Sequence, residues 1–200
     1  MNLEGEKLKQ SFYERKDVVK IARDLLGKTL VTCIDGKITG GRIVETEAYS
    51  WRERGCHAFD ARKTKRNAVM FGQGGYAYVY LCYGIHHLFN IVTNREGVAE
   101  AVLVRALEPS LGIGLMENRR RTLRPYQLTS GPGKLTRALG IDGNWNGKCL
   151  LEGDIWVEDW GERIAARQVI ASPRIGIDYA GKDAKLPWRF HLKDNQWVSG

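Results

Sequence analysis

Apolar residues recur at helical spacing in the segment "RKDVVKIARDLLGKTL", which covers residues 15–30. Four of them fall on one face of a helix: Val18, Ile21, Ala22 and Leu25. Asp17 stands where an N-cap is expected, and Gly27 stands where a helix would stop. The pattern therefore predicts a short amphipathic helix that leads into the core.

Alternating and β-branched residues follow and predict two hairpins. "TLVTCI" and "KITGGRIVETEAY" flank the turn residues Asp35 and Gly36, which predicts a hairpin of two strands. "YAYVYLCYGIHHLFNIVTN" is aromatic and β-branched, with a break at Tyr83 and Gly84 that predicts a second hairpin. "AEAVLVRALEP" reads as one more strand, which Pro109 ends.

The rest of the chain predicts two helices and then short strands. "SLGIGLMENRRR" and "SGPGKLTRALG" are helical in pattern, the second with Ser130 as N-cap, Pro132 in the first turn and Gly140 at the stop. Short strands are predicted in "GDIWVED", "RQVIASPRIGI" and "WRFHL". Residues 1–200 thus form a single α+β domain around a curved, largely antiparallel sheet flanked by helices, with residues 1–11 as a flexible N-terminus.

Composition and charge narrow the function classes. The chain is 43% hydrophobic and 27% charged, as in ordinary globular proteins, and no apolar run approaches the roughly 20 residues that span a bilayer. No secretory signal is visible, so we expect a cytoplasmic protein, associated with the nucleoid if it is bacterial. The net charge of +8 favours a polyanionic partner, which charge alone leaves open among DNA, RNA and membranes.

Cysteine usage argues against a metal centre and against disulfides. The four cysteines lack a C-x-x-C pair and any regular spacing to the four histidines: Cys33, Cys56, Cys82 and Cys149. We therefore expect reduced thiols, no metal and no cofactor.

Acidic residues interrupt an otherwise buried strand at residues 41–50. Because alternate strand residues share a face, Glu45, Glu47 and Tyr49 should project together, opposite the small and apolar Val44, Thr46 and Ala48. A buried carboxylate is costly unless a cation or hydrogen-bond donors pair with it, so its presence indicates either such a partner or a functional role. Arg105 shares the face of Leu103 in an apolar strand and needs an acid in turn. The strands can therefore bring carboxylates, a guanidinium and tyrosine faces to one pocket.

Five segments in order carry a family resemblance: "GRIVETEAY", "RNAVMF", "YAYVYLCYGIHHLFN", "VLVRALEP" and "SGPGKL". Together they resemble the alkyladenine DNA glycosylase family, also called 3-methyladenine or methylpurine DNA glycosylases, from about residue 12 to the C-terminus. The resemblance implies a fold similar to the C-terminal domain of methionyl-tRNA formyltransferase. It also implies excision of alkylated or deaminated purines from duplex DNA in base excision repair. We expect a monomer without a cofactor, because a protein that bends one duplex around a protruding tyrosine has no geometric need for a partner.

The same resemblance implies roles for individual residues. Glu47 would be the general base, and Arg105 and a backbone carbonyl near Ile175 would help to hold the attacking water. Tyr83, at the hairpin tip, would fill the space left by the flipped nucleotide. Substrate-binding positions would be Tyr49, His57, Tyr80 and Asn90. Apart from the resemblance, two basic runs could contact the DNA backbone, "RKTKR" at residues 62–66 and "RRRTLR" at residues 119–124. We favour the first, with Arg62, Lys63, Lys65 and Arg66, because it lies nearer to the matched residues.

The chemistry explains why these residue types would be used. A flipped base can stack on aromatic walls, and electron-rich tyrosine faces attract the positive charge of an N-alkylated purine. A carboxylate can stabilise an oxocarbenium-like sugar and activate water, which would leave an abasic site without a strand-cleaving step.

Two other functions are compatible with the same residues. A metal-dependent nuclease could use Glu45, Glu47, His57 and Asp60 as ligands. A DNA- or RNA-binding β module could stack bases on tyrosines, with Glu47 merely paired to Arg105.

Overall fold

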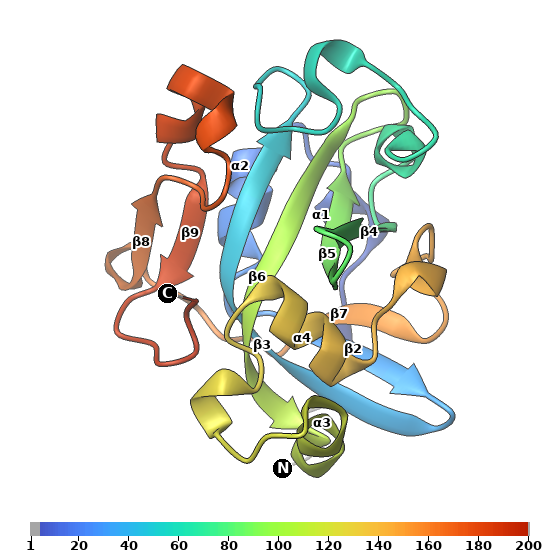
Figure 1. The fold of residues 1–200 in the computed structure, drawn as a ribbon, viewed down its shortest axis with the longest axis vertical. Coiled ribbons are helices and arrows are strands. Elements are labelled where there is room, and N and C mark those ends of the chain that lie inside the picture. The colour runs from blue at the N-terminus through green and yellow to red at the C-terminus, as the bar shows by residue number, and fades with distance from the viewer. Residues whose placement is uncertain (1–4, 200) are drawn as a thin grey trace.

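A nine-stranded antiparallel sheet forms the body of the protein in a computed structural model that describes residues 5–199 (Figure 1). Its strands run in the order β1-β7-β2-β3-β6-β5-β4, and a hairpin of β8 and β9 joins at β3. The strand bounds are β1 Glu6–Lys7, β2 Thr29–Ile34, β3 Lys37–Ser50, β4 Ala77–Cys82, β5 His86–Thr93, β6 Glu100–Leu111, β7 Ile155–Asp159, β8 Val169–Ser172 and β9 Arg189–Leu192. The prediction of a single α+β domain with an antiparallel sheet is confirmed.

Strand β3 pairs with two different strands along one of its edges, and the sheet branches there. Along one edge it pairs first with β2, through Lys37–Arg42, and then with β9, through Glu45–Glu47. Along its other edge it pairs with β6 over most of its length, with register shifts on both sides of Glu45. Glu45 and Glu47 therefore lie where three strands, β6, β3 and β9, run side by side.

Four α-helices and several 3₁₀ turns complete the fold. The α-helices are α1 Gln10–Tyr13, α2 Val18–Asp24, α3 Ile113–Arg120 and α4 Pro132–Leu139. The 3₁₀ turns are Phe59–Ala61, Ala68–Phe71, Pro125–Gln127, Gly143–Trp145, Ala166–Gln168 and Asp178–Lys185. Among residues 5–199, no helix has the length and apolar character needed to cross a membrane.

Helix caps agree largely with the sequence pattern. The Asp17 side chain accepts a hydrogen bond from the backbone N–H of Lys20, as predicted for an N-cap. Gly140 ends α4 with a φ of +75°, a conformation that favours glycine. The N-cap of α4 is Gly131 and not the predicted Ser130, because Gly131 has a φ of +138° that the chain needs to enter the helix.

The helices cover the two faces of the sheet. Figure 1 shows α4 in front of the long strands and α2 behind them. The face of β3 that carries Val44, Thr46 and Ala48 is buried, and the Thr46 hydroxyl donates to the carbonyl of Ala22 in α2 at 2.7 Å. The opposite face of β3 is consequently the one that carries Glu45, Glu47 and Tyr49.

Two expectations about segment ends are wrong in part. Strand β6 continues through Pro109 to Leu111, because Pro109 lies opposite Gly41 at a register shift where the ladder is already interrupted. Glu6–Lys7 pairs with β7 and Leu8 is buried, so residues 5–11 are part of the fold. Residues 1–4 of the predicted flexible N-terminus lie outside the described residues.

The register shift near Pro109 generates a stability prediction. A Cβ on Gly41 would lie 2.5 Å from the carbonyl oxygen of Glu108 and 2.9 Å from the Cα of Pro109, whereas a Cβ on Gly114 meets no atom within 4 Å. We expect Gly41→Ala to lower the free energy of unfolding by about 1–3 kcal/mol. Gly114→Ala, the matched control in α3, should raise it by about 0.5–1 kcal/mol. Urea unfolding measures both, and a midpoint unchanged by Gly41→Ala would contradict the close approach.

Candidate active site

A cavity of about 800 Å³ opens on the face of the sheet that carries α4. Its walls come from the ends of β3 and β6, the β4–β5 hairpin, the start of α4 and the segment after β8. Eight of the residues proposed from the sequence line it: Tyr49, His57, Arg66, Tyr80, Tyr83, Asn90, Arg105 and Ile175. The fold thus brings together residues that are far apart in the chain.

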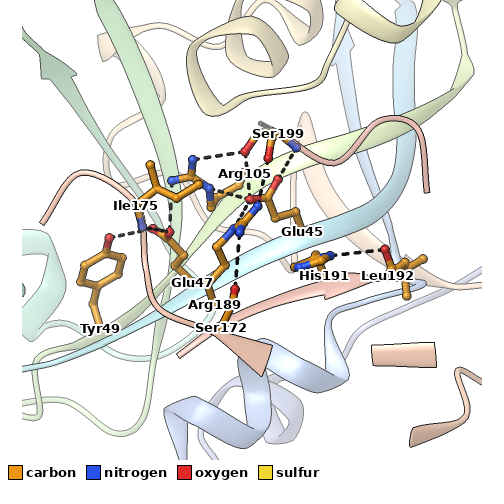
Figure 2. Close-up of polar contacts among 10 residues, drawn as sticks. All are labelled: Glu45, Glu47, Tyr49, Arg105, Ser172, Ile175, Arg189, His191, Leu192 and Ser199. Carbon is orange, nitrogen blue, oxygen red and sulfur yellow. Dashed lines mark hydrogen bonds and ion pairs between the residues drawn. The ribbon is translucent and has the colours of Figure 1, made fainter. Parts of the chain in front are cut away.

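Beneath the cavity, Glu45 and Glu47 are held by buried arginines (Figure 2). Both glutamates are fully buried, with 0% exposure, and Arg105 is 6% exposed. The Arg105 Nε donates to Glu45 Oε1 at 2.8 Å, and its Nη1 lies 3.2 Å from Glu47 Oε1. One guanidinium therefore bridges the two acids that the sequence pattern placed on one face.

Glu45 has further partners from the last part of the chain. Arg189 Nε donates to Glu45 Oε1 at 2.6 Å, and the backbone N–H and hydroxyl of Ser199 donate to the same carboxylate at 2.7 and 2.9 Å. Burial alone would raise the pKa of Glu45, but the Arg105 charge, the Ser199 amide and Arg189 hold that pKa below its ordinary range. Glu45 is thus paired with two basic neighbours, Arg105 and Arg189.

Glu47 accepts from three sides. Its Oε1 accepts from the backbone N–H of Ile175 at 2.8 Å and faces Arg105, and its Oε2 accepts from the Tyr49 hydroxyl at 2.8 Å. Glu47 is not itself part of the cavity lining, but Tyr49, Arg105 and Ile175 are. A molecule in the cavity therefore approaches the carboxylate between these three partners. The contact from Ile175 is made by its amide, whereas the sequence analysis expected a carbonyl contribution near this residue.

Aromatic side chains form one wall of the cavity. The Nδ1 of His57 lies 2.9 Å from the Tyr78 hydroxyl, and the His57 ring meets the Tyr80 ring edge-on at 4.6 Å between centroids. Burial raises the pKa of Tyr78 and of Tyr80, so both hydroxyls stay protonated at neutral pH. Burial and the neighbouring Arg66 charge lower the pKa of His57, which favours the neutral imidazole.

The hairpin tip and the inner strand supply two further candidates. Tyr83 is 88% exposed at the β4–β5 turn and has a φ of +50°, followed by Gly84 at +69°. This pair of left-handed residues makes a tight turn that projects the tyrosine away from the sheet. Asn90 is buried, lines the cavity and donates through Nδ2 to the carbonyl of Tyr78 at 3.0 Å, which fixes the orientation of its amide.

The four residues predicted to contact the DNA backbone differ in their position relative to the cavity. Arg62, Lys63, Lys65 and Arg66 are all exposed. Only Arg66 is part of the cavity lining, where its guanidinium lies over the Tyr80 ring at 5.3 Å from the centroid. The other three lie outside the cavity.

Sequence reasoning missed a second buried ion pair. Arg174 makes two hydrogen bonds of 2.7 Å to the carboxylate of Glu53, and it donates to the Ala48 carbonyl at 2.8 Å. Its guanidinium also lies over the Tyr49 ring at 4.7 Å, so this pair fixes the segment that presents Ile175 to Glu47. No local signal identifies Glu53 and Arg174 as partners, since 121 residues separate them.

The residues of the metal-nuclease alternative do not converge. Within residues 5–199, no group of three or more His, Cys, Asp or Glu side chains is arranged to hold a metal ion. Glu45 and Glu47 are committed to Arg105, and His57 contacts Tyr78 on another wall. This geometry favours a carboxylate that is positioned by arginine over one that binds a cation.

Known proteins resemble this chain over nearly all of its length. The sequence model of the methylpurine-DNA glycosylase family matches residues 11–196. The chain belongs to the methylpurine-DNA glycosylase family. A protein of Carboxydothermus hydrogenoformans is 49% identical over 96% of this chain and 98% of its own length, and one of Methanoculleus marisnigri is 47% identical over the same shares. A third, from Chlamydia felis, is 43% identical over 92% of this chain and 95% of its own length.

Each of these relatives bears a name that proposes a 3-methyladenine DNA glycosylase. Membership of the methylpurine-DNA glycosylase family confirms the resemblance seen in the sequence. It makes the chain a DNA glycosylase of DNA repair, a hydrolase that acts on N-glycosyl bonds.

The Glu45 cluster generates a prediction about stability and pH. Because the pKa of Glu45 in the folded protein lies below its ordinary value of 4.5, its contribution to stability is present above about pH 4.5 and is lost as the pH falls through the lowered pKa. We expect Glu45→Gln to cost about 3–5 kcal/mol at pH 7, since the buried Arg105 and the partly buried Arg189 lose a charged partner. The difference from wild type should shrink toward pH 3.

Urea unfolding from pH 3 to pH 7 measures this difference. Glu96→Gln, the same change at an exposed acid, is the control and should leave the free energy of unfolding within about 0.5 kcal/mol of wild type. A Glu45→Gln penalty of equal size at pH 3 and pH 7 would contradict the assignment of a lowered pKa.

Proposed function

We propose that this glycosylase flips alkylated or deaminated purines out of duplex DNA and hydrolyses their N-glycosyl bond, leaving an abasic site. The substrates we infer are 3-methyladenine, 7-methylguanine, hypoxanthine and ethenoadenine. The observation that carries the proposal is the Glu47 carboxylate, held by Arg105 directly beneath an aromatic cavity large enough for a purine nucleotide. The names of the relatives support 3-methyladenine among these lesions.

Base extrusion is the first step that the site must perform. A base inside a duplex cannot reach a catalytic carboxylate, so the nucleotide has to leave the stack at a cost of a few kcal/mol. Tyr83, which is exposed at a tight turn on the rim of the cavity, suits insertion into the vacated space. Tyr49, His57 and Tyr80 then offer faces and edges against which the flipped base can stack.

Bond cleavage is assigned to Glu47. As the base leaves, positive charge develops on the sugar, and a carboxylate nearby stabilises it electrostatically. The same carboxylate can take a proton from the attacking water. The Arg105 and Ile175 N–H groups hold Glu47 Oε1, and the Tyr49 hydroxyl holds Oε2, so the oxygens have little freedom to turn away.

A hydrolytic route without a Schiff base is part of the proposal. Lys134 is a lysine of the cavity lining, and it lies at the start of α4, where its Nζ is 3.5 Å from the Ser130 hydroxyl. Glu47, in contrast, lies beneath the floor, where Arg105, a residue of the lining, holds its carboxylate. We therefore infer attack by water and no strand-cleaving lyase step, by a protein that acts as a monomer on double-stranded DNA.

Base release from an end-labelled duplex that carries one hypoxanthine or one ethenoadenine tests the function. In EDTA, we expect wild type and the control Glu96→Gln to release base, and Glu47→Gln to lose at least about 100-fold in single-turnover rate, since general-base catalysis contributes that much. Strand breaks should appear only after alkali, and borohydride should trap no covalent complex.

The other outcomes select among alternatives. Glu47→Gln that releases base at the wild-type rate would show that the wrong acid was chosen. Lesion binding without release by wild type, on these and on methylated DNA, would favour the base-stacking module. Breaks without alkali would point to Lys134 as a nucleophile.

A second prediction concerns Asn90. Its fixed amide lies in the cavity wall, where it would exclude the exocyclic amine of guanine while admitting adenine-like bases. We expect Asn90→Ser to raise release of 7-methylguanine relative to hypoxanthine by about 10-fold or more, as removal of one steric and polar clash is worth about 1–3 kcal/mol. The relative single-turnover rates measure this, and an unchanged ratio would contradict the role.

A further inference from the structure

The charged residues of the cavity lining share one sign. They are all basic: Arg66, Arg105, Arg120, Lys134 and Arg137. No aspartate or glutamate belongs to the lining that the structure describes, and Glu47, just beneath it, is already paired with Arg105. A positively charged base that enters this cavity therefore meets positive charge and finds no free carboxylate at the surface.

The tyrosine faces are less attractive to a cation than the sequence alone suggests. The Arg174 guanidinium lies over the Tyr49 ring at 4.7 Å from its centroid, and the Arg66 guanidinium lies over the Tyr80 ring at 5.3 Å. The attraction of a ring for a cation is electrostatic, so a second cation beside the same ring is opposed by the first. Both tyrosines line the cavity, and contact with a neutral base does not carry this repulsion.

Arg66 differs from the other basic residues of the lining in its position beside Tyr80, and most of its N–H groups donate no hydrogen bond to the protein. It is exposed, it lines the cavity beside Tyr80, and the hydrogen bond that the structure gives it is a long one of 3.4 Å from Nη2 to the Leu81 carbonyl. A guanidinium carries five N–H donors in a fixed fork. Most of these donors are free to meet acceptor atoms of a base that stacks against Tyr80.

We propose that Arg66 is a specificity-determining residue, which donates to the acceptor edge of a neutral flipped purine, such as O6 and N7 of hypoxanthine, and disfavours purines that carry a positive charge. This inference rests on the proposed function, because it concerns which lesions the same cavity accepts. It removes Arg66 from the DNA-backbone cluster and assigns it to the base. It also reverses the expectation that the tyrosine walls select N-alkylated cations.

Arg62 provides a matched control for this proposal. It belongs to the same exposed basic run, it carries the same charge, and it lies outside the cavity lining. Arg62→Gln and Arg66→Gln therefore remove equal charge from the same region of the surface. A loss of general electrostatic attraction to DNA should be alike in the two variants, whereas an effect on lesion choice should be specific to Arg66.

The test compares single-turnover base release from one neutral and one cationic lesion. The duplexes carry hypoxanthine or 7-methylguanine at the same position, and the proteins are wild type, Arg62→Gln, Arg66→Gln and Arg66→Lys. We expect Arg66→Gln to lower the rate on hypoxanthine by about 10-fold or more, the size of one charge-assisted hydrogen bond. The rate on 7-methylguanine should stay level or rise. Arg66→Lys should retain the discrimination against the cation but lose part of the hypoxanthine rate.

Each other outcome has a definite reading. Arg66→Gln and Arg62→Gln that lower both rates by the same factor would overturn the proposal and return Arg66 to the DNA backbone. A wild type that releases only 7-methylguanine would overturn it as well. If wild type releases neither lesion, the proposed function fails together with the inference, whereas an unchanged lesion ratio in an active Arg66→Gln variant defeats the inference alone.

Discussion

Arg105 bridges Glu45 and Glu47 at the part of β3 that pairs with both β6 and β9, and this bridge couples the charges of β3 to the arrangement of its neighbouring strands. Buried charges are costly unless each is paired and hydrogen-bonded. Two glutamates and two arginines, Arg105 and Arg189, balance one another here without exposure of either acid. The balance requires β3, β6 and β9 to lie side by side, and it requires Ser199 to reach Glu45. The change of partner from β2 to β9 along β3 is thus coupled to the placement of Glu45 and Glu47 in that strand.

The same bridge links the fold to the chemistry. A carboxylate that is to act on a sugar has to be presented at a cavity yet kept from turning or from binding elsewhere. Arg105, the Ile175 amide and the Tyr49 hydroxyl fix Glu47 from three directions, and all three residues also line the cavity. The second buried pair, Glu53 with Arg174, holds the segment that supplies the Ile175 amide. Under the proposed function, stability and catalysis therefore depend on the same interactions.

Sequence reasoning succeeded where the determining interactions are local. The alternation in β3 correctly predicted that Glu45, Glu47 and Tyr49 share one face. Asp17 correctly predicted the start of α2, and the Tyr83–Gly84 break correctly predicted a tight turn. Strand alternation, helix caps and turns all depend on residues that are near neighbours in the chain. The presence of Arg105 in an apolar strand correctly predicted that it pairs with an acid, since it bridges Glu45 and Glu47. Family resemblance then selected the residues of the cavity.

It failed where partners come from distant segments. Ser199 lies 154 residues from Glu45, and Arg174 lies 121 residues from Glu53, so no spacing rule links them. The place of Arg66 at the cavity wall depends on how the loop between β3 and β4 folds back onto Tyr80, which a basic run in the sequence does not reveal. The prediction that Pro109 ends β6 was wrong, because the ladder is already interrupted by a register shift there and does not need the backbone N–H that proline lacks.

Arg105→Lys is the sharpest test of the bridge between Glu45 and Glu47, because lysine keeps the positive charge but cannot reach both acids with a planar fork. The measurement is the single-turnover rate of hypoxanthine release, together with the affinity for the same duplex, under conditions where circular dichroism shows the variant folded. We expect unchanged affinity and a rate at least about 10-fold lower, since Glu47 would lose its alignment. A wild-type rate in the folded variant would show that charge alone suffices, and would contradict the role given to the Arg105 bridge.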